Sequence, residues 1–176
     1  MILYEKGGGN IVERRGNVVE QRGDIVEQRR ENILLVDDRP ENLLVLESVL
    51  EDCEYNLFKA QSGYEALRMA LRHPLDMVLL DVQMSGMDGF EVATLLRGKR
   101  ETKDVAIIFI TANSKDPEHI QRGYDIGAEN YLFKPIDPEE LKQKIEAALK
   151  FRRYKRQMKL HDMRTSRRQS QHHHCD

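Results

Sequence analysis

The apolar run 77–80, which ends on Asp81, constrains the fold more than any other stretch of the sequence. A run of strand length without a polar residue is typical of a strand that is covered on both faces, and such strands occur in parallel sheets flanked by helices. Ligands of these folds bind just beyond the carboxyl ends of the strands. We therefore expect Asp81 to lie where a reactive group is displayed.

Three further apolar runs end on polar side chains in the same manner: residues 33–36 before Asp37 and Asp38, residues 106–110 before Thr111, and residues 131–133 before Lys134. Between these runs, apolar side chains recur at the three-to-four-residue spacing of a helix. The pattern from residue 32 to about residue 150 predicts five strand–helix repeats, an α/β fold with helices on both faces of a parallel sheet. We expect a flavodoxin-like (βα)5 doubly wound sheet with strand order 2-1-3-4-5, in which the first and third strands lie side by side.

The expected strands are Asn32–Val36, Tyr55–Ala60, Met77–Asp81, Ala106–Thr111 and Asn130–Phe133, and the expected helices begin at Pro40, at Gly63, near Phe90, after Pro117 and after Pro138. The last helix continues beyond Lys150 as an extended C-terminal helix. This arrangement would bring Asp37, Asp38 and Asp81 together at one edge of the sheet.

Three carboxylates within a few Å repel one another, and this repulsion raises their pKa values. A divalent cation removes the conflict, and hard oxygen ligands with room for water suit Mg²⁺, which also pairs with phosphate. The hydroxyl of Thr111 and the ammonium of Lys134 would complete a site that neutralises a phosphoryl group transferred in line to Asp81. The alternative, that each acid only caps a helix or faces water, accounts poorly for four successive strand ends.

These motifs, in this order, resemble the receiver domain of the two-component response-regulator family over residues 32–150. The resemblance implies that Asp81 is the phosphoacceptor. It implies that Asp37 and Asp38 are the metal-binding acidic pair, with Asp38 the more direct ligand and Asp37 acting through water. The backbone carbonyl of Gln83 would complete the shell of a Mg²⁺ cofactor.

The resemblance also implies a switch. Thr111 would follow the phosphoryl group, Lys134 would pair with it, the Lys134–Pro135 bond would be cis, and Tyr131 would swing inward when Thr111 moves. An ordinary surface tyrosine is the alternative for Tyr131.

Two further positions of the family bear on this chain. Gln83 and Asn113 occupy positions that tune dephosphorylation. One departure is Ser85, which replaces the proline that usually follows the methionine in this loop. We expect this replacement to loosen the loop.

As a receiver, the chain would accept a phosphoryl group from a histidine kinase or a histidine phosphotransfer protein without being a turnover enzyme. Phosphorylation would switch the face formed by the helix after Pro117, the strand 130–133 and the last helix. That face, or the C-terminal helix, would also be the surface for a homodimer.

A different alternative comes from residues 160–165, which resemble the phosphoaccepting His box of sensor histidine kinases, with His161 as the acceptor. Ser166 stands where that box has a proline. The chain would then be the front of a receiver–histidine kinase hybrid truncated at the box, or His161 would be a coincidence on a basic helix.

Two further alternatives fit the residues less well. A haloacid-dehalogenase-like phosphatase also uses a strand-end aspartate, but it has a second acid two residues on, where this chain has Gln83. A receiver that serves only for dimerisation and is never phosphorylated is the last alternative.

Composition adds limits on partners and location. The formal net charge of −2 gives no general attraction to nucleic acid or membranes. The sequence lacks an apolar run of membrane-spanning length, so we expect a cytoplasmic protein with no membrane partner. Cys53 and Cys175 do not indicate a disulfide scaffold.

The two ends of the chain differ from the middle. Residues 1–31 carry a seven-residue repeat with a glycine in each unit, which disfavours a coiled coil. We expect a flexible lead, and the alternative is a set of short strands joined by turns. Residues 151–176 predict a basic amphipathic helix and a disordered tail, without a motif that reads bases, so we do not expect specific nucleic-acid binding.

Overall fold

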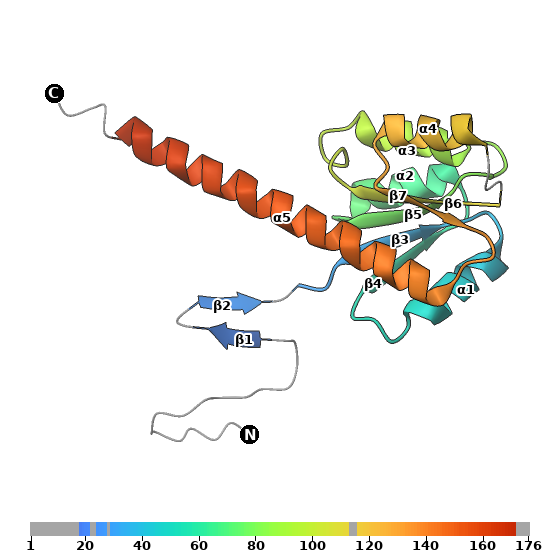
Figure 1. Cartoon of the computed structure of the whole chain (residues 1–176), viewed down its shortest axis with the longest axis horizontal. Coiled ribbons are helices and arrows are strands. Elements are labelled where there is room, and N and C mark those ends of the chain that lie inside the picture. Colours follow the sequence, from blue (N-terminus) through green and yellow to red (C-terminus); the bar gives the residue numbers. More distant parts are fainter. Residues whose placement is uncertain (1–17, 22–23, 28, 113–115, 172–176) are drawn as a thin grey trace, which may run out of the picture. The chain divides into compact units, whose positions relative to one another are not determined.

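The computed structural model describes the backbone of residues 18–21, 24–27, 29–112 and 116–171, and the side chains of residues 29–112 and 116–163 (Figure 1). The chain divides into two compact units, residues 1–30 and residues 31–176. The larger unit contains every described helix and the larger of the two sheets, and it is called the α/β unit below.

In the smaller unit, β1 (Val18–Gln21) and β2 (Asp24–Glu27) form an antiparallel pair. These residues therefore form short strands, as the alternative interpretation had it, and the flexible lead over residues 1–31 stays a prediction. The β-branched pairs Val18-Val19 and Ile25-Val26 favour extended backbone, which gives the physical reason. The two residues between the strands lie outside the described part of the chain.

The sheet of the α/β unit is parallel throughout and has the order β4-β3-β5-β6-β7. Its strands are β3 (Asn32–Val36), β4 (Asn56–Ala60), β5 (Met77–Asp81), β6 (Ala106–Thr111) and β7 (Asn130–Phe133). Counted from β3, this is the order 2-1-3-4-5, so the flavodoxin-like doubly wound fold is confirmed. All five residues of β3 and of β5 are buried, as expected for strands covered on both faces.

Helices cover both faces of the sheet (Figure 1). They are α1 (Pro40–Leu50), α2 (Gly63–Arg72), α3 (Gly89–Arg97), α4 (Pro117–Ile126) and α5 (Pro138–Gln171). Side chains alternate along β3, so that Ile33 and Leu35 pack with α1 and α5, whereas Leu34 and Val36 pack with α2, α3 and α4. Two apolar cores therefore lie on the two faces of the sheet and hold its strand ends in place.

Local sequence signals explain where the helices begin. Pro40 and Pro117 stand in the first turns of α1 and α4, where a missing N–H costs nothing. The side chain of Asp88 accepts a hydrogen bond from the N–H of Glu91, whose own side chain accepts from the N–H of Asp88. This capping box makes α3 start directly after the loop that follows Asp81.

The helix α5 has 34 residues, a length of about 50 Å, and it runs beyond the sheet (Figure 1). Arg152 donates hydrogen bonds to the carbonyl oxygens of Leu75 and Asp76, and Arg153 pairs with Glu31 and Glu146. The predicted extension is thus helical through Gln171 and is attached to the α/β unit near residue 152. None of the described helices is both long and apolar enough to cross a membrane.

Candidate functional site

Three carboxylates meet at the carboxyl ends of β3 and β5. Asp37 and Asp38 follow β3, Asp81 ends β5, and one oxygen of each lies within 4.8 Å of the others. Asp37 and Asp81 are buried, and Asp38 is half-buried. The adjacency of β3 and β5 in the sheet produces this cluster, as the strand order predicted.

Lys134 brings the fourth charge to the cluster. Its Nζ donates to Oδ2 of Asp37 at 2.9 Å and to Oδ1 of Asp81 at 3.1 Å. Lys134 follows β7, two strands away from β5, and its backbone N–H donates to the carbonyl oxygen of Thr111. The ammonium therefore bridges two carboxylates from neighbouring strands.

The cluster has an excess of negative charge. Burial raises the pKa of Asp81 to about 6, and the charge of Asp37 acts in the same direction while Lys134 opposes both. Burial lowers the pKa of Lys134, but its hydrogen bonds to Asp37 and its interactions with Asp81 outweigh burial and leave that pKa raised. Three carboxylates and one ammonium leave a net negative charge that a further cation can neutralise. Hard oxygen donors of this kind suit Mg²⁺.

Asp38 accepts a hydrogen bond at Oδ2 from the backbone N–H of Ser85, at 2.9 Å. A proline at position 85 has no N–H and cannot make this bond. Ser85 thus ties the loop to the acidic pair, and the expectation that it loosens the loop stays a prediction.

Asn42 belongs to the site but was missed in the sequence. Its Nδ2 donates to both oxygens of Asp37, at 3.0 and 2.9 Å, and the N–H of Arg39 donates to Oδ1 of the same carboxylate. The position of Asn42 in the first turn of α1, five residues after Asp37, was the available signal. These donors fix the orientation of the Asp37 carboxylate.

Gly89 is a second residue whose role the sequence did not reveal. A Cβ at this position would lie 2.3 Å from the carbonyl oxygen of Asp81 and 2.9 Å from Cα of Val82. Only glycine lets α3 begin so close to the end of β5.

Thr111 and Tyr131 lie on the neighbouring strands β6 and β7. Thr111 ends β6 and is fully buried. Tyr131 is 2% exposed, so it points inward, and its hydroxyl donates to the carbonyl oxygen of His119 in α4. The alternative of an ordinary surface tyrosine is therefore wrong.

The remaining site predictions have different outcomes. The Lys134–Pro135 bond is cis, as the resemblance implied. Gln83 is exposed in the loop after β5, and its carbonyl as a metal ligand stays a prediction. Asn113 lies outside the described residues. His161 is exposed on α5 and is not part of the carboxylate cluster.

Comparison with known proteins identifies the family to which the chain belongs. Residues 33–146 match the model of the response regulator receiver domain. The chain belongs to the response regulator receiver family. The cluster described above thus lies in a receiver domain, a module of two-component signalling.

Known receivers occur in proteins of very different size. The transcriptional regulatory protein YvrH of Bacillus subtilis is 40% identical over 120 residues, which cover 68% of this chain and 49% of YvrH. A probable cyclic di-GMP phosphodiesterase of Vibrio cholerae is 37% identical over 123 residues, which cover 70% of this chain and 27% of that protein. The chain thus spans about a quarter to a half of the length of these relatives.

A solved structure has the same fold at similar size. The receiver domain of the sensor histidine kinase PA1611 from Pseudomonas aeruginosa, crystallised with a magnesium ion in its active-site cleft, aligns with a TM-score of 0.63 and 29% identity. The alignment covers 69% of this chain and 98% of that domain. The whole receiver fold is therefore present here.

Proposed function

We propose that this chain accepts a phosphoryl group on Asp81 from a phosphohistidine of a histidine kinase or a histidine phosphotransfer protein. A carboxylate oxygen of Asp81 would form a bond to phosphorus while the phosphorus–nitrogen bond breaks and the imidazole leaves with the electron pair and takes up a proton. The observation that carries the proposal is the buried Asp81 beside two other carboxylates and the ammonium of Lys134.

Residues Asp37, Asp38 and Asp81 would hold Mg²⁺, with the carbonyl of Gln83 as a further ligand. When bound, the ion would offset the charge of the carboxylates and of the incoming phosphoryl oxygens. The geometry suits this role because three hard oxygen donors lie within 4.8 Å of one another, and the ammonium of Lys134 contacts two of them, Asp37 and Asp81. Asn42 would keep the Asp37 carboxylate in one orientation during the exchange.

Lys134 and Thr111 would respond to the new charge at Asp81. Before phosphorylation Lys134 bridges Asp37 and Asp81, and afterwards its ammonium would pair with a phosphoryl oxygen. The hydroxyl of Thr111 would donate to another, and Tyr131 would keep its inward position. Because Tyr131 contacts α4 and lies on β7, the change would pass to the face of α4, β7 and α5.

This role makes the chain a signal receiver in the cytoplasm that assists its own phosphorylation and dephosphorylation without turning over a separate substrate. A second candidate role rests on α5, which stays helical through the His-box-like residues 160–165. On this account the chain is the front of a receiver–histidine kinase hybrid, and an open reading frame that continues into an ATP-binding domain would establish it.

The test is incubation of the full chain with Mg²⁺ and acetyl phosphate, followed by intact-mass analysis. We expect one phosphoryl group that is stable in acid and labile in base, and that is absent from Asp81→Asn. Asp52→Asn is the control, because Asp52 is an exposed acid outside the cluster. Full labelling of Asp81→Asn would contradict the proposal.

A further inference from the structure

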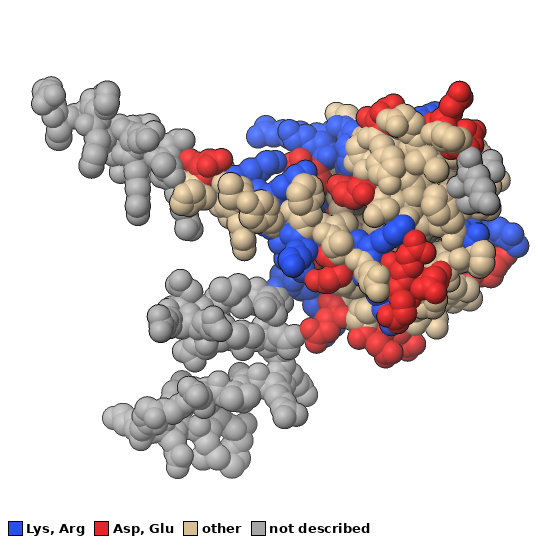
Figure 2. Space-filling view, in the orientation of Figure 1, with Lys and Arg blue, Asp and Glu red and all other residues tan. Residues whose placement is uncertain are grey.

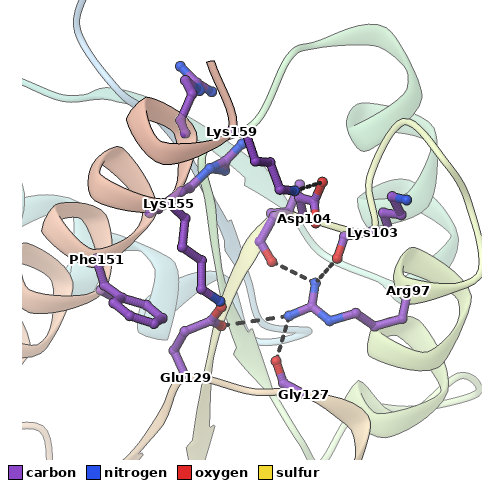
Figure 3. A pocket seen from close by; sticks show the side chains of 12 residues that line it. Arg97, Lys103, Asp104, Gly127, Glu129, Phe151, Lys155 and Lys159 are labelled. Atoms are coloured by element: carbon purple, nitrogen blue, oxygen red, sulfur yellow. Dashed lines mark hydrogen bonds and ion pairs between the residues drawn. The ribbon is translucent and has the colours of Figure 1, made fainter. Parts of the chain in front are cut away.

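A pocket of about 310 Å³ lies between α5 and the end of the sheet opposite to Asp81 (Figure 3). Its lining comes from the segments that precede β6 and β7, from the end of α3 and from α5. The carboxylate cluster instead follows the strands, and β6 separates the two ends by about 17 Å. Six cationic side chains line the pocket: Arg97, Lys103, Arg152, Lys155, Arg156 and Lys159.

Arg97 is held by the protein itself. Its guanidinium donates to the carbonyl oxygens of Lys103 and Val105 at 3.0 and 2.6 Å, and to that of Gly127 at 2.7 Å (Figure 3). It also pairs with Glu129 at 3.6 Å, and Glu129 accepts a further hydrogen bond from the N–H of Ile107. Arg97 and Glu129 therefore form the wall of the pocket, and Glu129 is already engaged.

The other carboxylates near the pocket are too few for its cations. Asp104 pairs with Lys159 at 3.4 Å, but both side chains are about two-thirds exposed, so this pair is weak. Buried Asp76 forms ion pairs with both Arg152 and Arg156, at 3.9 and 3.7 Å. These ion pairs join four of the six cations to three carboxylates.

Lys103 and Lys155 add positive charge outside these ion pairs, and the charge of Lys155 also acts on Glu129. Among the described side chains, neither has a carboxylate oxygen within the 4.0 Å of an ion pair. Figure 2 shows Lys and Arg side chains gathered where α5 leaves the sheet. A concave site with an excess of one sign of charge concentrates its field. The six cations outnumber the lining carboxylates Asp104 and Glu129, so this pocket attracts anions.

Phe151 adds an aromatic surface to the same pocket. Its side chain is 52% exposed, it lines the pocket, and Nζ of Lys155 lies 4.4 Å from its ring centroid. An exposed aromatic ring next to cations is suited to stack a base while the cations contact phosphates.

We propose that this pocket binds a nucleotide whose phosphates contact Lys103, Lys155 and Arg156 and whose base packs on Phe151. The volume of about 310 Å³ lies at the lower end of the range of small-molecule sites. Such a ligand bridges the loop before β6 and the extension of α5. It stabilises the docked position of that helix, because a ligand favours the arrangement to which it binds.

The test is calorimetric titration of the full chain with ADP and, separately, with pyrophosphate at physiological ionic strength. We expect ADP to bind and pyrophosphate to bind more weakly. The double variant Lys103→Gln/Lys155→Gln should lose about tenfold or more in affinity for both. Lys150→Gln, which removes a charge from the same helix outside the pocket, should bind as the parent does.

Phe151→Ala should weaken the binding of ADP and leave that of pyrophosphate unchanged. Hydrogen exchange provides a second readout, with slower exchange of the amides of residues 151–159 when ADP is present. Absence of ADP binding, an equal loss in Lys150→Gln, or binding only of an acidic peptide would overturn the site. Equal affinity for ADP and pyrophosphate would overturn the contact of the base with Phe151.

Discussion

The backbone N–H of Ser85 is the residue-level feature that separates this site from the pattern of its family. It donates to Asp38, the acid expected to be the more direct metal ligand. Hydrogen bonds of this kind orient metal ligands, and their loss typically lowers metal affinity by roughly 10- to 100-fold. We expect Ser85→Pro, which removes the donor, to weaken Mg²⁺ binding about tenfold in calorimetric titration.

Ser85→Ala is the matched control, because it keeps the N–H and should bind Mg²⁺ as the parent does. If Ser85→Pro binds Mg²⁺ as tightly as Ser85→Ala, the N–H does not position Asp38.

The raised pKa of Asp81 predicts a pH dependence of stability in the protein without metal. The folded state holds the proton more tightly, with a pKa of about 6 against an ordinary value of 3.8. Between these values the folded state binds more protons than the unfolded state, so stability falls as the pH rises through this window. Ionisation of buried Asp81 lowers the free energy of unfolding. This loss is complete above pH 6 and absent below pH 3.8.

Asp81→Asn removes this cost. We expect the variant to be more stable than the parent by about 1–2 kcal/mol at neutral pH, with a gain that disappears towards pH 4. Urea unfolding in the presence of a chelator, at several pH values, measures this difference. A gain that is constant with pH would mean that the charge of Asp81 is not its cause.

The main site residues could be predicted because each one directly follows an apolar run that could be identified as a strand. The strand order alone was enough to predict that three of them lie together, namely Asp37, Asp81 and Lys134. Asn42 and the N–H of Ser85 were not predictable in this way. Their contacts depend on the direction in which α1 and a loop leave the sheet, and apolar periodicity carries no information on that.

At the scale of elements, α4 approaches β7 so closely that Gly123 leaves space for Tyr131. A Cβ on Gly123 would lie 1.8 Å from the hydroxyl oxygen of Tyr131 and 2.6 Å from its Cζ. We expect Gly123→Ala to force Tyr131 out of its buried position and to destabilise the protein by about 1–3 kcal/mol in urea unfolding.

A double-mutant cycle tests the cause of that loss. In a Tyr131→Leu background the clash is absent, so Gly123→Ala should cost much less. Gly98→Ala serves as the control, because its added Cβ would meet its nearest neighbours at an ordinary 3.6 Å. Equal costs of Gly123→Ala in the two backgrounds would exclude Tyr131 as the residue that needs the space.

The sequence predicted the ends of helices and strands correctly where capping residues and apolar runs indicate the same boundary. Strand β3 and helix α2 match the expected bounds, whereas β4 begins at Asn56 rather than Tyr55, and α3 begins at Gly89 rather than Phe90. The capping residue Asp88 sets the start of α3 and could have been used. The pair β1–β2 was harder to predict, because its glycine-containing repeat supports both turns and flexibility.

At the scale of the whole molecule, α5 presents apolar side chains along one stripe of its extension. Phe151, Tyr154 and Met158 are 52%, 59% and 47% exposed, at the three–four spacing of a coiled-coil seam. The same stretch carries five cations and, within the described side chains 151–163, a single acid, Asp162. Two such helices attract each other through apolar area and repel through charge.

Salt separates these two contributions, because it screens exposed charges and leaves apolar burial intact. We therefore expect self-association of the full chain through α5 to increase with ionic strength, as measured by light scattering after size exclusion. Tyr154→Ser/Met158→Ser should abolish the increase. Leu44→Ser, which changes an equally exposed leucine on α1, should not alter it. Self-association that weakens with salt would instead indicate a contact made by opposite charges, on a surface other than the apolar stripe of α5.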